Sequence, residues 1–309
     1  MKNKKIVITG AAGFIGSNIT HAIYEDNDVI AIDNLSTGNI DNISDILSDI
    51  DFKRESITDL EMLKAAFKDA DYVLHLAAIP SVPRSINNPI ATNEANVTGT
   101  LNVLAAARDT GVKRVVFSSS SSVYGNTETL PKIETMPPCP LSPYATSKLT
   151  GENYCRNFYE IYGLETVALR YFNVFGPKQD PNSQYAAVIP KFITAISSDR
   201  QPEVYGDGNQ TRDFTYVENV VQANIKACTS QNGPGKVYNI GCGEQNSLNK
   251  LIELINKHMD KDICPIFKDT REGDVRDSLA SITAAKNDLG YSPTVNFEQG
   301  LLKTIAWFT

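Results

Sequence analysis

The chain has 309 residues, of which 41% are hydrophobic and 21% charged, a composition typical of a globular protein with a full core. Its net charge of −7, with no concentrated basic patch, argues against a nucleic-acid or anionic-membrane partner. Five cysteines without a paired C-x-x-C motif argue against a disulfide framework and a zinc site and suit a reducing compartment. The apolar run after the basic N-terminus is too short for a signal peptide or membrane span, so we expect a cytoplasmic protein.

The first half of the chain alternates short β-branched runs with stretches of helical length. The expected strands are Ile6–Thr9, Val29–Asp33, Tyr72–Leu76, Val115–Ser118 and Thr166–Tyr171. The expected helices are Phe14–Tyr24, Asp59–Phe67, Ile90–Thr110 and Tyr144–Tyr162. Continuous apolar strands separated by helices indicate a buried parallel sheet. The sequence therefore predicts an α/β fold, a Rossmann-type doubly wound parallel sheet, over residues 1–174.

Beyond residue 174 the pattern is interrupted by prolines and glycines. The expected helices there are Ala187–Ser197, Glu218–Cys228, Leu248–Met259 and one near Phe297–Phe308. The strand-like run Val237–Ile240 is expected to return to the main sheet. We therefore expect residues 175–309 to form a smaller, partly discontinuous substrate domain, with a segment near 212–242 returning to the first domain.

A glycine cluster follows the first expected strand and opens a helix. Gly10, Gly13 and Gly16 are spaced G-x-x-G-x-x-G, which lets a backbone turn approach a pyrophosphate at a helix N-terminus. Asp33 ends the second strand about 20 residues later, where a carboxylate accepts a hydrogen bond from a ribose 2′-hydroxyl and repels a 2′-phosphate. The motif and this carboxylate together predict NAD rather than NADP as the cofactor.

A serine run and a tyrosine–lysine pair follow a strand of the expected sheet. Ser118–Ser122 leave that strand, and Tyr144 and Lys148 lie four residues apart at a helix start, on one helical face. A phenol near an ammonium can take the proton from a sugar hydroxyl while hydride leaves the same carbon for NAD⁺. Lowering a tyrosine pKa from about 10 to about 7 takes ~4 kcal/mol, so Lys148 needs help from other charges and hydrogen bonds. We predict Ser120, Tyr144 and Lys148 as the catalytic residues.

The order of these motifs resembles the extended short-chain dehydrogenase/reductase family. Arg170–Gly176, Arg212–Phe214, Tyr238–Gly241 and Arg271–Asp274 are similar to segments of its nucleotide-sugar branch, above all UDP-N-acetylglucosamine 4-epimerases. The resemblance implies that Asn173 contacts a UDP-sugar and that Arg212 and Arg271 hold its diphosphate, a task that suits guanidinium forks. It also implies that Tyr185–Lys191 binds the uridine.

The predicted site consists of residues that bind the cofactor and residues that bind the UDP-sugar, and no metal ligands are predicted. The predicted cofactor contacts are Gly10, Gly13, Phe14, Ile15, Gly16, Asp33, Asn34, Ile57, Leu76, Ala77, Ala78, Asn96, Ser118, Tyr144, Lys148 and Tyr171. The predicted UDP-sugar contacts are Ser120, Ser121, Tyr144, Asn173, Ala187, Val188, Lys191, Tyr205, Arg212, Arg271, Asp274 and Ser278. The chain departs from the family pattern at Ser56 and Pro80, where relatives often have an aspartate and a lysine at the cofactor.

The residues after Ser120 discriminate among the family's reactions. Dehydratases of the family place Asp-Glu there, as acid and base for the loss of water, whereas this chain has Ser121 and Ser122. We therefore expect 4-epimerisation of a UDP-hexose through a 4-keto sugar. Ser278 matches a position where a bulky tyrosine excludes 2-acetamido groups in epimerases, so we expect UDP-GlcNAc/UDP-GalNAc as substrates and UDP-Glc/UDP-Gal as further ones.

Two alternatives to this function stay open. One is a UDP-uronic acid 4-epimerase, which would need an additional polar or cationic clamp for the C6 carboxylate that the sequence does not identify. The other is a non-catalytic NAD(H)-sensing or scaffold protein that kept the fold. By analogy with relatives, which pair the helices matching Ile90–Thr110 and Tyr144–Tyr162 into a four-helix bundle, we expect a homodimer.

Overall fold

A seven-stranded parallel sheet forms the centre of the protein. The computed structural model describes residues 1–180, 188–270 and 276–309. In the sheet the strand order is β11-β6-β5-β4-β1-β2-β3. Its strands are β1 (Lys5–Thr9), β2 (Asp28–Ile32), β3 (Asp51–Lys53), β4 (Tyr72–His75), β5 (Arg114–Ser120), β6 (Glu165–Tyr171) and β11 (Lys236–Ile240). The predicted Rossmann-type α/β fold is confirmed.

Helices cover both faces of this sheet, and each face has its own apolar core. On one face α1 (Phe14–Ile23) and α8 (Val217–Thr229) pack against the strands. On the other face lie α2 (Leu60–Phe67), α5 (Gly99–Thr110) and α6 (Pro143–Tyr162). Burial on both faces explains why the strands are continuously apolar rather than alternating.

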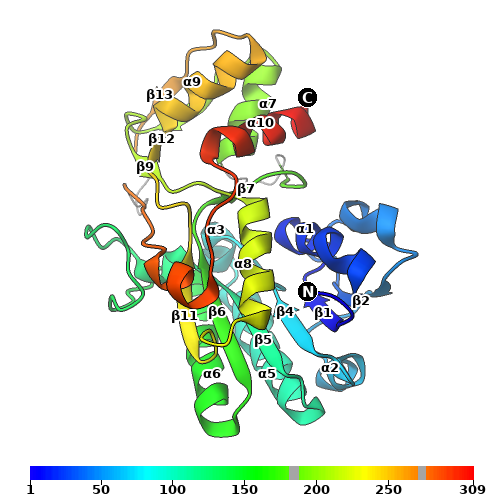
Figure 1. The fold of residues 1–309 in the computed structure, drawn as a ribbon. Helices are drawn as coiled ribbons and strands as arrows, with labels where there is room; N and C mark the ends of the chain where they lie inside the picture. The colour runs from blue at the N-terminus through cyan, green and yellow to red at the C-terminus, as the bar shows by residue number, and fades with distance from the viewer. Residues whose placement is uncertain (181–187, 271–275) are drawn as a thin grey trace.

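A second, smaller part lies beyond the carboxyl ends of the strands (Figure 1). Its helices are α7 (Val188–Ser197), α9 (Leu248–Met259) and α10 (Phe297–Phe308), which share a separate apolar core. Its short strand pairs are β7 (Val174–Phe175) with β10 (Thr215–Tyr216), β8 (Glu203–Tyr205) with β13 (Ile266–Lys268), and β9 (Thr211–Arg212) with β12 (Asn246–Ser247). Strand β11 pairs in parallel with β6, so this late segment lies in the main sheet. The domain boundary at residue 174 stays a prediction.

The expected helix Ile90–Thr110 is interrupted in the structure. It consists of α4 (Pro89–Asn93), a π-helical turn η3 (Glu94–Thr98) and α5, preceded by the short helix α3 (Val82–Asn87). The buried Asn96 lies in the π turn and holds the loop after β4: its Oδ1 accepts from Ile79 N at 2.7 Å, and its Nδ2 donates to Ile79 O at 3.2 Å. The wider π turn thus directs the buried Asn96 side chain towards the backbone of Ile79, which the periodicity of a regular helix does not predict.

Among the residues that the structure describes, no helix is both long and apolar enough to span a bilayer. The five cysteines are all free.

Candidate active site

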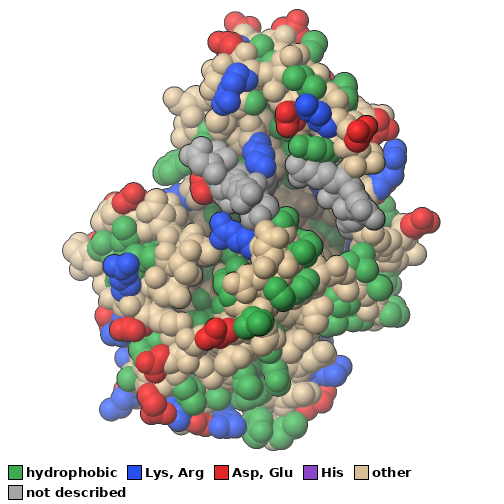
Figure 2. Space-filling model, turned by 180° about the vertical axis from the view of Figure 1, so that it is seen from behind, with side chains coloured by type: hydrophobic (Ala, Val, Ile, Leu, Met, Phe, Trp, Pro, Cys, Tyr) green, Lys and Arg blue, Asp and Glu red, His purple; other side chains and the backbone are tan. Residues whose placement is uncertain are grey.

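A cavity of about 1440 Å³ opens at the carboxyl ends of the central strands. The lining residues include Gly10 after β1, Leu76–Ala78 after β4, Ser118–Ser122 at and just after the end of β5, and Tyr171–Val174 at and just after the end of β6. The surface is visibly hollowed between the upper and lower parts of the molecule (Figure 2). The volume exceeds the roughly 300–1,000 Å³ of a pocket for one small ligand. It therefore has room for a dinucleotide and a second ligand.

The glycine turn forms one wall of this cavity, and its backbone is too crowded for side chains. A Cβ on Gly10, whose φ is +73°, would lie 2.7 Å from Ala77 N, and a Cβ on Gly16 would lie 2.0 Å from Gly10 O. Gly13 is the N-cap of α1 and offers no side chain to the first-turn amides. An anion can therefore reach the positive end of this helix without displacing a capping group.

Asp33 lies at the end of β2, buried at the same wall. Its Oδ2 accepts from Ala12 N at 3.0 Å and its Oδ1 accepts from Leu35 N at 2.8 Å. Burial raises the pKa of Asp33, and these two amide donors oppose that rise. The carboxylate therefore holds the glycine turn in place and faces the cavity with acceptor positions for a ribose hydroxyl.

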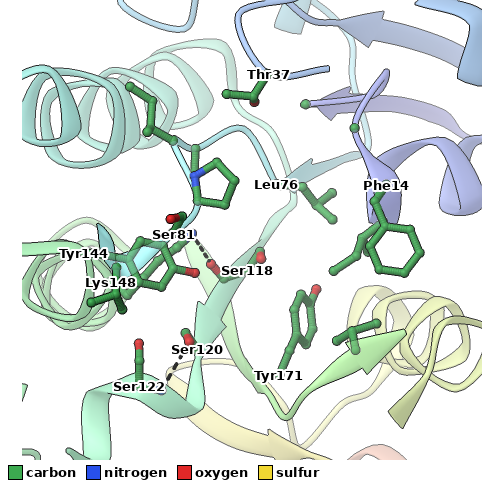
Figure 3. A pocket seen from close by; sticks show the side chains of 18 of the residues that line it. Phe14, Thr37, Leu76, Ser81, Ser118, Ser120, Ser122, Tyr144, Lys148 and Tyr171 are labelled. Atoms are coloured by element: carbon green, nitrogen blue, oxygen red, sulfur yellow. Dashed lines mark hydrogen bonds between the residues drawn. The ribbon is translucent and has the colours of Figure 1, made fainter. Parts of the chain in front are cut away.

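The predicted catalytic side chains converge on the opposite wall. The N-terminus of helix α6 is capped by Ser142, whose hydroxyl accepts from Ala145 N at 3.1 Å, and Pro143 occupies the first turn. This places Tyr144 and Lys148 on the cavity side, near Ser118 and Ser120 of β5, while Phe14, Leu76 and Tyr171 lie across the cavity (Figure 3). The ammonium of Lys148 donates to Ser118 O at 2.7 Å and lies 5.9 Å from the centre of the Tyr144 ring.

The protonation of this group depends on burial. Burial raises the pKa of Tyr144, and a hydrogen bond with Ser120 lowers it by less. Burial lowers the pKa of Lys148 to about 8, opposed by the charge of Glu152. The chain's own groups therefore do not make Tyr144 a phenolate. This agrees with the expectation that Lys148 alone cannot lower the pKa of Tyr144 far enough. Additional positive charge or hydrogen bonding in the loaded site has to favour the anion.

On the side of the second part, Asn173, Arg212 and Ser278 line the cavity. Asn173 Nδ2 donates to Asp213 O at 3.1 Å and to Ser278 Oγ at 3.2 Å. Arg212 Nη1 donates to the carbonyls of Thr211 at 2.9 Å and Arg276 at 2.8 Å, which fixes the guanidinium at the wall. The structure thus brings two predicted substrate contacts, Asn173 and Ser278, into direct contact with each other.

Most of the other predicted residues also line the cavity, with a few exceptions. Asn96 is not among the described lining residues; it braces Ile79 instead, so its effect on a cofactor would be indirect. Val188, Lys191 and Tyr205 are not among them either, and their contact with uridine stays a prediction. The predicted contacts Ala187, Arg271 and Asp274 lie outside the described residues.

The hydroxyl of Ser122, which the sequence analysis named only against dehydration, is buried without a hydrogen-bond partner among the described residues. Sequence reasoning missed several other polar residues at the cavity. Lys178 follows the Gly176–Pro177 turn and donates to Asn42 O at 2.6 Å, which ties this loop to the segment after β2. Arg84 and Lys132 come from α3 and a long loop. A cation directly after a Gly-Pro turn was a weak local signal, whereas Arg84 and Lys132 had none.

Comparison with known proteins agrees with this geometry. The model of the NAD dependent epimerase/dehydratase family matches residues 6–241. The chain belongs to this family. A UDP-N-acetylglucosamine 4-epimerase from Methanobrevibacter ruminantium, solved with UDP-N-acetylmuramic acid, has a TM-score of 0.96 and 43% identity, covering 100% of this chain and 99% of that one. A UDP-glucose 4-epimerase from Thermotoga maritima, solved with UDP-glucose, has a TM-score of 0.94 and 38% identity over 98% of both chains.

Relatives known by sequence agree with these structures. A putative UDP-glucose 4-epimerase of Methanocaldococcus jannaschii is 39% identical over 98% of this chain and 97% of its own length. A UDP-glucuronate 4-epimerase of Thermodesulfobacterium geofontis is 31% identical over 97% and 95%. These matches confirm the predicted enzyme class, a UDP-sugar 4-epimerase that uses NAD. They include epimerases of different UDP-sugars and do not select one of them.

The family uses NAD, and the cavity wall formed by the glycine turn and Asp33 fits this cofactor. The crowded backbone of Gly10 and Gly16 and the uncapped first turn of α1 suit a pyrophosphate, and Asp33 suits an unphosphorylated ribose. Lys148, one turn from Tyr144, is placed to donate to hydroxyl groups bound between the two walls.

Proposed function

We propose that this protein catalyses the interconversion of UDP-hexoses at C4, with the N-acetylated pair UDP-GlcNAc/UDP-GalNAc as its main substrates. The observation that carries the proposal is the convergence of Ser120, Tyr144 and Lys148 in a cavity whose facing wall is a dinucleotide turn. An interconversion at C4 needs the reversible removal of a hydride from that carbon and of a proton from its hydroxyl, and these residues supply the proton transfer.

Each residue has one task in this chemistry. Tyr144 takes the proton from the C4 hydroxyl, and Ser120, hydrogen-bonded to Tyr144, holds the reacting oxygen. Lys148 adds positive charge one helical turn away, which favours the phenolate. NAD, when bound, supplies the acceptor and then the donor of the hydride. Tyr144 afterwards returns the proton to the oxygen of the turned 4-keto sugar, so that no proton is lost over the cycle.

The cavity lining argues against dehydration as the outcome. Ser121 and Ser122 occupy the places directly after Ser120, and both line the cavity. Serine hydroxyls neither donate nor accept protons readily near neutral pH, so an acid and base for the loss of water are missing at these positions. The 4-keto sugar therefore has to be reduced again.

The sugar side of the cavity supports an N-acetylated substrate. Ser278 is small, lines the cavity, and contacts Asn173, so it leaves space where a tyrosine would fill it. The similar structure from Methanobrevibacter ruminantium is that of a UDP-N-acetylglucosamine 4-epimerase, and its bound ligand also carries an N-acetyl group.

A uronic acid substrate is the alternative that the relatives suggest, because some of them are UDP-glucuronate 4-epimerases. It would require a clamp for the C6 carboxylate. Lys132, on the loop after β5, is one cationic residue of the cavity, but it is buried, and its ammonium donates to the carbonyls of Thr127 and Thr129. These contacts hold Lys132 in the fold and argue against it as the clamp. Arg84 of α3 also lines the cavity, so a direct comparison of substrates tests the uronate alternative.

The test of the function is to incubate the purified protein and NAD with UDP-GlcNAc, UDP-Glc and UDP-glucuronic acid separately. We expect UDP-GalNAc to form fastest, with no net accumulation of NADH. Fastest turnover of UDP-glucuronic acid would favour the uronate alternative. A lack of turnover of every UDP-sugar by protein that binds NAD would favour a non-catalytic role.

The substrate gate is tested with Ser278→Tyr. We expect this variant to lose at least about tenfold in kcat/KM for UDP-GlcNAc, ~1.4 kcal/mol, while UDP-Glc turnover changes less. Thr283→Tyr, an exposed position on the same segment, is the matched control. Full activity of Ser278→Tyr towards UDP-GlcNAc would rule out the gate.

A further inference from the structure

A buried carboxylate lies one helical turn beyond Lys148. Glu152 of α6 is 4% exposed, and it is four residues from Lys148 and eight from Tyr144. Residues four apart on a helix are neighbours on one face, so Glu152 extends the row formed by Tyr144 and Lys148. The sequence motif ends at Lys148 and gave Glu152 no role.

Glu152 is fully engaged by polar partners from two strands. Its Oε1 accepts from Ser119 Oγ at 2.5 Å and from Arg170 Nε at 2.8 Å, and its Oε2 accepts from Arg170 Nη2 at 2.7 Å. Ser119 and Arg170 are register partners in β5 and β6, and the next pair is Ser120 with Tyr171. The carboxylate thus connects the catalytic helix to the ends of the two strands that carry Ser120 and, on the facing cavity wall, Tyr171.

The connection continues to the turn after Ser120. The guanidinium of Arg170 lies 4.7 Å over the ring of Tyr124, which ends the 3-10 turn η4 (Ser121–Tyr124). The Tyr124 hydroxyl donates to Asn239 Oδ1 of β11 at 2.7 Å. A bidentate guanidinium–carboxylate pair of this kind fixes orientation as well as distance.

Among the described residues, Glu152 is the carboxylate whose charge acts on Lys148, one helical turn away. The other titratable groups around Lys148 and Glu152 are Tyr144 and Cys155 from α6, His75 from β4, and Arg170 from β6. Burial raises the pKa of Tyr144 and of Cys155, and burial lowers the pKa of His75 to about 3, so these three are uncharged near neutral pH. Burial lowers the pKa of Lys148, and the charge of Glu152 is the largest influence that raises it.

We propose that Glu152 is a positioning residue that keeps the buried Lys148 protonated at working pH and fixes the catalytic helix to the strand bearing Ser120. It touches neither substrate nor cofactor, and it acts through Lys148 and Ser119. The catalytic part of this inference rests on the proposed function, because Lys148 matters to the reaction only if Tyr144 is the base.

The test is the pKa of Lys148, measured by NMR on protein with ¹³C-labelled lysine side chains, without substrate. The signal of Lys148 is the one that is missing in Lys148→Met. In Glu152→Gln, which keeps the size of the side chain, we expect the pKa of Lys148 to fall from about 8 by roughly one further unit. The alkaline limb of kcat/KM for UDP-sugar should move to lower pH by the same amount.

The matched control is Ser119→Ala, which removes one hydrogen bond to Glu152 but keeps its charge. We expect Ser119→Ala to leave the pKa of Lys148 unchanged. Because Glu152→Gln leaves Arg170 without its partner, a double variant Glu152→Gln/Arg170→Met serves if the single variant does not fold. The double variant is then compared with Arg170→Met, so that the two proteins differ in the charge at position 152 alone, and we expect the lower pKa of Lys148 in the double variant. An unchanged pKa of Lys148 in folded Glu152→Gln, or equal values in the double variant and Arg170→Met, would overturn the proposal, even if activity fell. Since the NMR measurement needs no turnover, it decides the role of Glu152 even if the wild-type protein epimerises no UDP-sugar.

Discussion

Lys148 shows how the site places charge at the expense of stability. The side chain is 4% exposed, and burial lowers its pKa from 10.5 to about 8. Since the pKa is lower in the folded than in the unfolded chain, folding disfavours the charged form. The cost is fully present below pH 8 and disappears as the pH rises towards 10.5.

The substitution Lys148→Met should therefore stabilise the protein at pH 7 while it removes epimerase activity. The expected gain in the free energy of unfolding is up to about 3 kcal/mol, from a difference of about 2.5 units in pKa. Urea unfolding at pH 7 and at pH 10.5 measures it, and the gain should vanish at the higher pH. The exposed Lys250→Met is the control. A loss of stability at pH 7 in Lys148→Met would contradict this account of the site.

At this scale the sequence identified the residues that carry the chemistry but not those that support them. Tyr144 and Lys148 have a fixed spacing on one helix, and Gly10, Gly13 and Gly16 follow one another in a turn, so a local pattern reveals them. Glu152 and Arg170 meet only because α6 packs against β6. Their contact depends on tertiary structure, which no spacing of residues in the chain encodes.

At the scale of elements, the turn between β1 and α1 has the tightest backbone of the site. A Cβ at Gly16 would lie 2.0 Å from Gly10 O, and a Cβ at Gly10 would approach the backbone of Ala77. The turn, the loop after β4 and the start of α1 therefore fit together only without side chains at these positions.

We expect Gly16→Ala to destabilise the protein by about 1–3 kcal/mol and to weaken NAD binding at least about tenfold, because the turn has to open. Isothermal titration with NAD and thermal unfolding measure the two effects. Gly111→Ala is the control: Gly111 has a φ of +75° but no neighbour within 4 Å, so this variant should lose stability and keep NAD affinity. Normal NAD affinity in folded Gly16→Ala would be inconsistent with this turn as the pyrophosphate site.

The elements that periodicity predicted best are those with long apolar patterns. The strands of the sheet centre and helices α1, α6 and α9 lie close to their expected bounds. Strand β3 (Asp51–Lys53) was missed because it is a short edge strand with charged residues. The π turn in the expected helix Ile90–Thr110 was missed because Asn96 is recruited by Ile79, a partner distant in sequence.

At the scale of the molecule, the surface near α6 carries apolar side chains without partners in one chain. Helices α3 and α4 pack against α6, and Ile90 of α4 is 79% exposed; Ile86 of α3 is 60% exposed but also lines the cavity. An exposed apolar side chain of this size beside a helix pair is a candidate for contact with another molecule where it forms part of a larger patch. We propose that this contact belongs to a homodimer.

Light scattering should then give about twice the mass of the 33.9 kDa chain, and Ile90→Lys should shift the protein towards the monomer. Leu302→Lys, at an exposed apolar position of α10, is the control and should remain dimeric. A monomer at every concentration of the wild-type protein would contradict the proposal.

The Rossmann-type sheet and the separate second part were predictable from the sequence, whereas the arrangement of the cavity residues in the second part was not. Alternation of strands and helices indicates the Rossmann-type sheet directly, but the second part is built from short strand pairs such as β9 with β12, joined over long sequence separations. Asn173, Arg212 and Ser278 meet there through these pairs. Their convergence was implied by family resemblance and not by local pattern.

The central claim is tested most directly with UDP-GlcNAc that carries deuterium at C4. If Tyr144 exchanges only the hydroxyl proton and the hydride returns to the same carbon, the UDP-GalNAc formed should retain the deuterium at C4 in full, and NADH should not accumulate. Loss of the deuterium to solvent, or its release in free NADH with a stable keto sugar as product, would contradict the account.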